Sequence, residues 1–181
     1  MVPLAEIEDL ERLSIDLQHA FKDPQNTDLS IHFPDTVHRY SGELDGVQSS
    51  LLETMNKCVA GKREQFVTFC GKQAVGMSTV TNQNEAPEAV NPNWPNVSEF
   101  IFRPYRDTRL GTLTVRNCIE VVKERFDGRA WTYVRKGNVP AEQLVQQAGF
   151  VMTNIIVPGQ EHQHVYLLGG DRQNRVWYNN R

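Results

Sequence analysis

Residues 100–114 constrain the fold of this chain more than any other stretch. The first part, Phe100-Ile-Phe102, is apolar and aromatic and predicts a buried strand. The second part contains Thr108, a good helix-capping residue, followed by apolar residues at helical spacing. The chain must therefore pass from a strand through a tight turn into the N-terminus of a helix.

The start of this helix has the chemistry of an anion site. The first N–H groups of a helix lack a carbonyl partner, and the helix dipole adds partial positive charge there. Arg103, Arg106 and Arg109 add three cations against one acid, Asp107. We therefore expect a phosphate or pyrophosphate to bind here, although an ordinary turn with solvated arginines would have the same pattern.

Composition limits the classes of function that such a site can serve. The 181 residues, of which 39% are hydrophobic and 23% charged, predict one domain over residues 1–181 with a peripheral tail at 170–181. The net charge of −3 gives no general basic field for nucleic acid, and no apolar run is long enough for a membrane span. Three widely spaced cysteines and an acidic N-terminus without signal-peptide features predict a cytoplasmic protein.

Hydrophobic periodicity predicts a mixed α/β (α+β) fold: a mostly antiparallel twisted sheet with helices on both faces. The strand–helix–strand unit at 97–134 should be a right-handed parallel crossover, with a ligand site beyond the end of its first strand. Leu29–Phe33 alternates in polarity and could form a short strand. The other expected elements are helices at 3–21, 47–59, 108–125 and 138–148, and strands at 65–70, 73–81, 97–103, 130–134, 150–157 and 164–168.

Two segments carry a more specific pattern. Arg106-Asp-Thr-Arg109-Leu-Gly111 follows the predicted central strand and opens the next helix. Asn138-Val-Pro-Ala-Glu-Gln-Leu-Val145-Gln-Gln-Ala-Gly-Phe150 covers the following helix. In this order, they resemble the phosphate motif Gln/Arg-x-x-Gly-x-Gly/Ala and the signature Asn-x-x-Ala-x-x-Leu-Tyr-x-x-x-Gly-Phe of the GNAT superfamily. The resemblance covers residues 65–168.

The resemblance implies an acetyl-CoA-dependent N-acetyltransferase, in which an amine attacks the thioester directly in a ternary complex. It implies that N–H groups of residues 107–112 hold the pyrophosphate and that Arg106 clamps one of its oxygens. The strand end at 100–102 would hold the pantetheine arm and polarise the thioester carbonyl. The cofactor-binding residues expected on this basis are Phe100, Ile101, Phe102, Arg106, Asp107, Thr108, Arg109, Leu110, Gly111, Thr112 and Asn138.

Three residues depart from the family pattern. Arg109 replaces the first motif glycine, and we expect its side chain to reach a phosphate. Pro104 lies one residue later than usual. Val145 replaces the tyrosine that commonly protonates the leaving thiolate, and valine cannot donate a proton. Water or another residue must then do so, or the chain is a GNAT-fold module that binds acyl-CoA without transfer, or a structural domain with no such site.

Glu99 is the catalytic candidate, because it precedes the cofactor-facing end of the central strand, where many family members keep a base. A partly desolvated carboxyl there would have a raised pKa, although Glu99 could instead contact a structural partner. We expect no metal site, since the chain lacks a ligand motif. The acceptor would be a small-molecule or peptide amine, and pairing through the last strands would give a homodimer. Further polar side chains that could border the acceptor, or be merely solvated, are His32, His38, Tyr40, His162 and His164.

Overall fold

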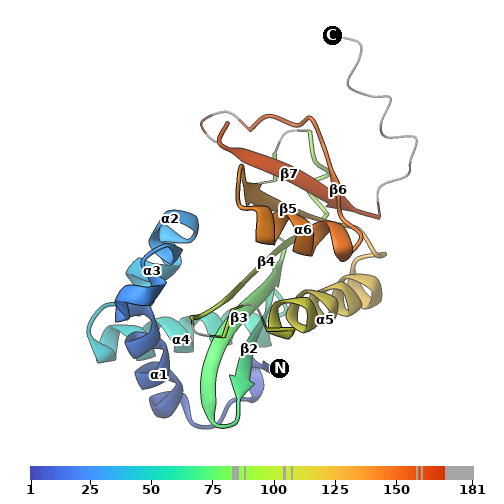
Figure 1. The fold of residues 1–181 in the computed structure, drawn as a ribbon. Helices are drawn as coiled ribbons and strands as arrows, with labels where there is room; N and C mark the ends of the chain where they lie inside the picture. Colours follow the sequence, from blue (N-terminus) through green and yellow to red (C-terminus); the bar gives the residue numbers. More distant parts are fainter. Residues whose placement is uncertain are drawn as a thin grey trace. The chain divides into compact units, whose positions relative to one another are not determined.

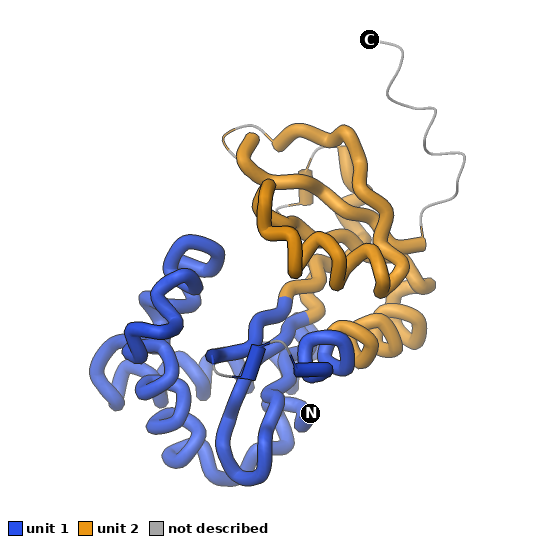
Figure 2. Tube along the Cα trace, viewed as in Figure 1, with its two compact units in different colours: residues 1–79, 99–114 blue, residues 80–98, 115–181 orange. Residues whose placement is uncertain are grey.

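A computed structural model (Figure 1) describes residues 1–82, 86–87, 89–103, 105–106, 108–157, 159 and 161–169. The chain forms two compact units, shown in blue and orange in Figure 2. Unit 1 comprises residues 1–79 and 99–114, and unit 2 comprises residues 80–98 and 115–181. Three elements contribute residues to both units: strand β3 (Gln73–Thr81), strand β4 (Asn96–Ile101) and helix α5 (Leu110–Arg125).

Within the described residues, seven strands form a sheet in the order β1-β2-β3-β4-β5-β7-β6. The parallel pair is β4 and β5, with Asn96 opposite Trp131, and the pairs β1–β2, β5–β7 and β6–β7 are antiparallel. This topology confirms the expected mixed, mostly antiparallel sheet and its parallel strand–helix–strand unit. The strands not yet bounded are β1 (Val2–Pro3), β2 (Arg63–Cys70), β5 (Ala130–Arg135), β6 (Val151–Met152) and β7 (Gln163–Leu168).

Unit 1 has helices on both faces of its strands. Val67 of β2 is buried in a core with Leu17 and Leu51, which come from two N-terminal helices. The next residue, Thr68, points to the opposite face, where its hydroxyl hydrogen-bonds Thr114 of α5 at 3.2 Å. Figure 1 shows the N-terminal helices gathered beside β2 and β3. They are α1 (Leu10–Lys22), α2 (Leu29–His32), α3 (Pro34–Tyr40) and α4 (Leu44–Val59), with 3₁₀ turns η1 (Leu4–Glu6) and η2 (Pro24–Asn26).

Unit 2 has its own apolar core, to which α5 and α6 (Val139–Gln147) contribute. Val122 of α5 packs there with Val145 of α6 and Tyr166 of β7. Trp131 of β5 is 1% exposed and belongs to a second apolar cluster with Ile155 and Val165. Its indole N–H donates to the carbonyl of Trp94 at 3.0 Å, so burial leaves this polar group satisfied.

The N-terminal segment differs from the sequence prediction. The first helix begins at Leu10 instead of residue 3, because Asp9 caps it by accepting a hydrogen bond from the Arg12 N–H at 2.9 Å. Val2 and Pro3 form strand β1, which pairs with β2 and which hydrophobic periodicity did not predict. The predicted strand at 29–33 is wrong, since Leu29–His32 is a helical turn.

Two apolar residues of the predicted helices are exposed to solvent. Leu113 of α5 is 56% exposed, and Val59 of α4 is 73% exposed. The strand expected at 150–157 is limited to Val151–Met152, because Thr153 turns its hydroxyl onto the Val165 carbonyl at 3.0 Å. The expected tail at 170–181 lies outside the described residues.

Candidate functional site

The turn from β4 into α5 is built by Thr108. Its hydroxyl donates to the Tyr105 carbonyl at 2.7 Å and accepts from the Leu110 N–H at 3.3 Å. The N–H of Leu113 bonds the Arg109 carbonyl at 3.0 Å and so begins the regular helical ladder. The N–H groups of Gly111 and Thr112 precede that ladder, as expected for an anion-binding helix start. Asp107 lies outside the described residues.

The end of β4 presents backbone groups that are already bonded. The Phe102 N–H donates to the Val75 carbonyl at 2.8 Å, and the Ile101 carbonyl accepts from the Arg106 Nε–H at 2.7 Å. The side chains of Phe100 and Phe102 are buried and pack edge-on against the ring of Phe21, with centroid distances of 5.5 and 5.0 Å. These two side chains therefore belong to the core of unit 1, and the contact of this strand end with a cofactor stays a prediction.

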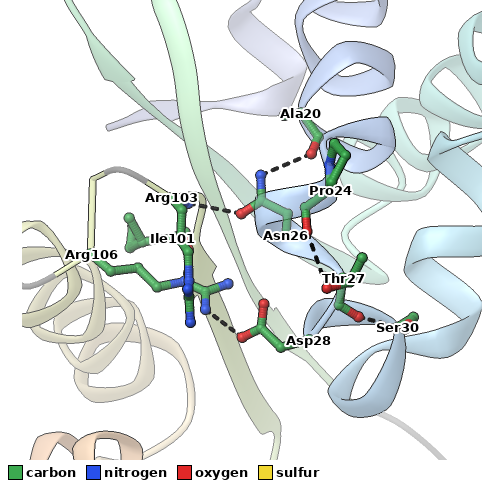
Figure 3. A network of polar contacts seen from close by, with 9 residues as sticks. All are labelled: Ala20, Pro24, Asn26, Thr27, Asp28, Ser30, Ile101, Arg103 and Arg106. Carbon is green, nitrogen blue, oxygen red and sulfur yellow. Dashed lines mark hydrogen bonds and ion pairs between the residues drawn. The ribbon is translucent and has the colours of Figure 1, made fainter.

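Arg106 lies in a polar network that Figure 3 shows from close by. Besides its bond to the Ile101 carbonyl, its Nη1 forms an ion pair and hydrogen bond with Oδ2 of Asp28. The neighbouring Arg103 N–H donates to Oδ1 of Asn26 at 2.8 Å, and the Asn26 amide donates to the Ala20 carbonyl at 2.9 Å. Asn26 and Asp28, which both precede α2, thus hold the turn that follows β4.

The charge of Arg106 acts on two carboxyl groups. Partial burial would raise the pKa of Asp28, but the hydrogen bond and charge of Arg106, with the charge of Arg103, outweigh it, so this pKa is lowered. Glu99 behaves in the opposite way. Burial raises the pKa of Glu99 to about 7, and the charge of Arg106 only partly opposes this. The Asp28 carboxyl is therefore ionised at neutral pH, whereas Glu99 is poised to exchange a proton.

Glu99 has one carboxyl oxygen, Oε2, that is inaccessible to solvent and has no hydrogen-bond partner among the described residues. The residue as a whole keeps partial exposure. The raised pKa has the direction expected from the sequence. A carboxyl with one buried oxygen that lacks a partner, in a central strand, is a suitable proton acceptor, and this role for Glu99 stays a prediction.

The remaining predicted cofactor residues fall into two groups. Arg109 is exposed at the helix start, and Leu110, Gly111 and Thr112 are partly exposed; all belong to unit 1. Asn138 belongs to unit 2, where it precedes α6 and makes no side-chain cap bond. The structure therefore brings the unit 1 residues together around one turn, and Asn138 belongs to unit 2.

Of the residues considered for the acceptor site, Tyr40 is corrected. It is 2% exposed and stacks on Phe21 at 5.7 Å, so it is a core residue. His38 and His162 are exposed, and His164 contacts the Tyr166 ring edge-on at 6.5 Å. Across the part of the chain that is described, no three His, Cys, Asp or Glu side chains gather to hold a metal ion.

Sequence reasoning missed Asn26 and Asp28. They lie in a weakly patterned segment, and Asp28 is 78 positions from Arg106. The Asp23-Pro24 turn shows that the chain bends there, but periodicity cannot show what a bend contacts. No helix in the described ranges is both long enough and apolar enough to cross a bilayer.

Comparison with solved structures places this geometry in a known fold. The ribosomal-protein-S5-alanine acetyltransferase from Vibrio fischeri superposes with a TM-score of 0.67 at 15% identity, covering 87% of both chains. The ribosomal L7/L12 alpha-N-protein acetyltransferase RimL, in complex with coenzyme A, gives 0.65 at 12% identity, covering 87% of this chain and 88% of that one. The chain has the GNAT fold.

The GNAT fold extends over nearly the whole chain in some comparisons. The aminoglycoside acetyltransferase AAC(6')-Ib, in complex with paromomycin and acetyl-CoA, covers 94% of this chain and 95% of its own at 15% identity, with a TM-score of 0.59. No protein-family model and no curated protein sequence matches the chain. The GNAT fold is the fold expected from the resemblance of residues 106–111 and 138–150, and identities of this size establish the fold alone.

Proposed function

We propose that the protein is an N-acetyltransferase that transfers an acetyl group from acetyl-CoA to an amine. The observation that carries this proposal is the Glu99 carboxyl in β4, which has a buried oxygen and a pKa of about 7 and lies on the strand that leads into the helix start at Thr108. GNAT-fold proteins with coenzyme A or acetyl-CoA bound support the choice of cofactor.

The cofactor pyrophosphate would bind at the start of α5. The N–H groups of Gly111 and Thr112 precede the helical ladder, and the exposed Arg109 adds a mobile cation. Among the described residues, Arg106 uses two of its five N–H donors, and we propose that another meets a phosphate oxygen. The proposal keeps Asp107, Thr108 and Leu110 in the same cradle and Phe100–Phe102 on the pantetheine arm, and it keeps Asn138 among the cofactor-binding residues.

The reaction needs a neutral amine. Glu99, or a water that it holds, would take a proton from the acceptor ammonium. The amine nitrogen would then attack the thioester carbonyl carbon, a C–N bond forms, the C–S bond breaks to release the thiolate, and the nitrogen loses its second proton to water. Val145 is 8% exposed in the core of unit 2, and its side chain has no acidic proton to donate. We therefore assign protonation of the thiolate to water.

The acceptor class is broad. Two of the compared proteins are described as acting on ribosomal proteins, and a third is in complex with an aminoglycoside, paromomycin. Both classes offer amines, so we propose a small-molecule or peptide amine as the acceptor. A cytoplasmic location and a homodimer formed through the last strands complete this proposal.

A second candidate function is a GNAT-fold module that binds acyl-CoA without transferring the acyl group. The burial of Val145 in the core favours it, because the usual proton donor at this position is missing and the site cannot expose one. The two functions differ only in turnover, so one pair of measurements separates them.

The experiment combines calorimetric titration of acetyl-CoA with release of free thiol in the presence of a panel of amines. We expect micromolar binding and thiol release that depends on one class of amine. Glu99→Gln should bind acetyl-CoA normally but lower the rate of thiol release by about 10²–10⁴-fold. Glu124→Gln, which changes an exposed residue of α5, should leave both the binding and the rate unchanged. Binding without turnover on any amine would support the module, and absence of binding at high micromolar concentration would reject both functions.

A further inference from the structure

Strands β3 and β4 are neighbours in the sheet (Figure 1), and their contacts fix which residues face each other. The Phe102 N–H donates to the Val75 carbonyl at 2.8 Å. One residue further along β3, Gly76 approaches Phe100 and Ile101 instead, where an added Cβ would lie 2.6 Å from the Phe100 carbonyl oxygen. The partner thus moves back along β4 as β3 advances, so the two strands are antiparallel with Val75 level with Phe102.

Two pairs of buried residues agree with this register. It places Met77 level with Phe100, and both are buried in the core of unit 1. Further along it places Val80 level with Val97, and both are buried in the core of unit 2. The two pairs fit one register without an extra residue in either strand.

Ser78 of β3 and Glu99 of β4 face each other in this register. Side chains alternate between the two faces of a sheet, so both point away from the core that holds Met77 and Phe100. The Cβ atoms of directly opposite residues in an antiparallel pair lie about 4.5–5.5 Å apart. Rotation about side-chain bonds therefore suffices to bring the serine hydroxyl within hydrogen-bond distance of the facing carboxyl.

Each of these two side chains has a buried polar atom without a partner. Ser78 is 1% exposed, and its Oγ and Oε2 of Glu99 have no hydrogen-bond partner among the described residues. A buried polar atom that stays unpaired is costly, and here one atom can donate while the other accepts. Other buried hydroxyls of unit 1, those of Ser14 and Thr54, already donate to carbonyls of their own helices.

The strands beside Glu99 bring few charged groups to it. β3 has no acidic or basic side chain, and Glu99 is the one such residue of β4. On β5 the titratable residues are Tyr133 and Arg135. The charge that acts on Glu99 is that of Arg106, in the turn after β4, and it only partly opposes the effect of burial. A neutral donor on β3 would favour the charged form of Glu99 further.

We propose that Ser78 is a positioning residue for the base: its hydroxyl donates to Oε2 of Glu99 when that carboxyl is ionised, and so holds the carboxylate ready to accept a proton from the acceptor amine. This inference rests on the proposed role of Glu99. The proton moves from the amine nitrogen to the carboxylate, whereas Ser78 keeps its own proton throughout. When Glu99 is protonated, rotation of the serine O–H bond releases it.

The test is a titration of Glu99 by NMR in the full chain, labelled with ¹³C at the glutamate carboxyl carbon. The Glu99 resonance is the one that is absent from the spectrum of Glu99→Gln. Ser78→Ala should raise the midpoint of this titration by about one pH unit, because the ionised carboxyl loses its donor. The change removes one buried oxygen atom and adds no bulk, so the fold should be kept.

Two further variants and a control separate the hydrogen bond from packing. Ser78→Thr retains the hydroxyl and should keep the midpoint close to that of the wild type. Ser78→Cys has a weaker donor of similar size and should lie between the wild type and Ser78→Ala. The matched control, Ser14→Ala, removes a buried hydroxyl of unit 1 that already donates to the Leu10 carbonyl at 2.6 Å, and should leave the midpoint unchanged.

The inference is overturned if Ser78→Ala leaves the Glu99 midpoint unchanged or lowers it, or if Ser14→Ala raises it equally. If the added methyl group prevents Ser78→Thr from folding, the midpoint of Ser78→Cys takes its place: a value as high as that of Ser78→Ala overturns the inference, and an intermediate value supports it. The titration needs no turnover. A protein that transfers no acetyl group therefore rejects the proposed function, and the titration still decides whether Ser78 acts on Glu99.

Discussion

Glu99 shows how one buried carboxyl links the chemistry of the site to the stability of the fold. Its pKa in the folded chain, about 7, exceeds the ordinary value of 4.5. Between these two pH values the folded state binds more protons than the unfolded state, so the free energy of unfolding falls as the pH rises through this window. Above about pH 7 the folded chain carries a buried negative charge that the charge of Arg106 only partly opposes.

Glu99→Gln should therefore stabilise the protein at alkaline pH. The amide has no charge to bury, and at 1.4 kcal/mol for each pKa unit we expect a gain on the order of 3 kcal/mol at pH 8. The difference should vanish below about pH 4.5, where the wild-type carboxyl is protonated in both states. Urea denaturation of both proteins at pH 4 and pH 8 measures this, and an equal difference at the two pH values would contradict the raised pKa of Glu99.

At the scale of elements, strand β3 has a contact that tolerates no side chain. A Cβ added at Gly76 would lie 2.6 Å from both the Phe100 carbonyl oxygen and Cδ1 of Ile101. Backbone cannot move aside as a flexible side chain can, so the two strands would have to separate. Gly46, in α4, has nothing within 4 Å of the same added atom.

Gly76→Ala should thus lower the free energy of unfolding by about 1–3 kcal/mol or more, and should disturb the adjoining strand end at Ile101. Gly46→Ala should raise it by about 0.5–1 kcal/mol, because alanine favours a helix. Chemical denaturation of both variants, beside the wild type, measures the two effects. Equal effects of the same sign would show that Gly76 has no special packing role.

Elements were predictable from the sequence where a turn residue marks their ends. The hairpin from β2 to β3 turns at Gly71, with φ of 62°, and Gly149, with φ of 97°, follows the end of α6 at Gln147; the hairpin and the end of this helix were expected from the predicted ranges. β1 was not, because two residues carry no periodicity, and α2 was mistaken for a strand because four residues fit either period. Of the site, the turn after β4 and the raised pKa of Glu99 could be predicted, whereas the Asp28–Arg106 pair depends on tertiary contact alone.

At the scale of the whole molecule, three elements run from one compact unit into the other. Because β3, β4 and α5 are continuous, we expect residues 1–181 to unfold as a single domain in one transition. The chain offers a direct test. Trp94 and Trp131 both belong to unit 2, whereas Leu51, which is fully buried, lies in the core of unit 1.

Leu51→Ala removes core volume from unit 1 and should cost about 2–5 kcal/mol. If the units unfold together, the tryptophan fluorescence of unit 2 should follow this change and its midpoint in urea should fall by the same amount as the circular dichroism midpoint. Leu52→Ala, at the next position of α4 and 50% exposed, is the control with little expected effect. A tryptophan transition that does not move would show two independent domains.

The division of unit 1 between residues 1–79 and 99–114 also has a consequence during biosynthesis. When the first 79 residues have been made, Phe21 still lacks Phe100 and Phe102, the rings that pack against it. At typical translation rates these partners follow on the order of 1–5 s later. For that interval the nascent chain exposes an aromatic face that a chaperone could bind, and the residues that close it are the ones that bring Glu99 into place.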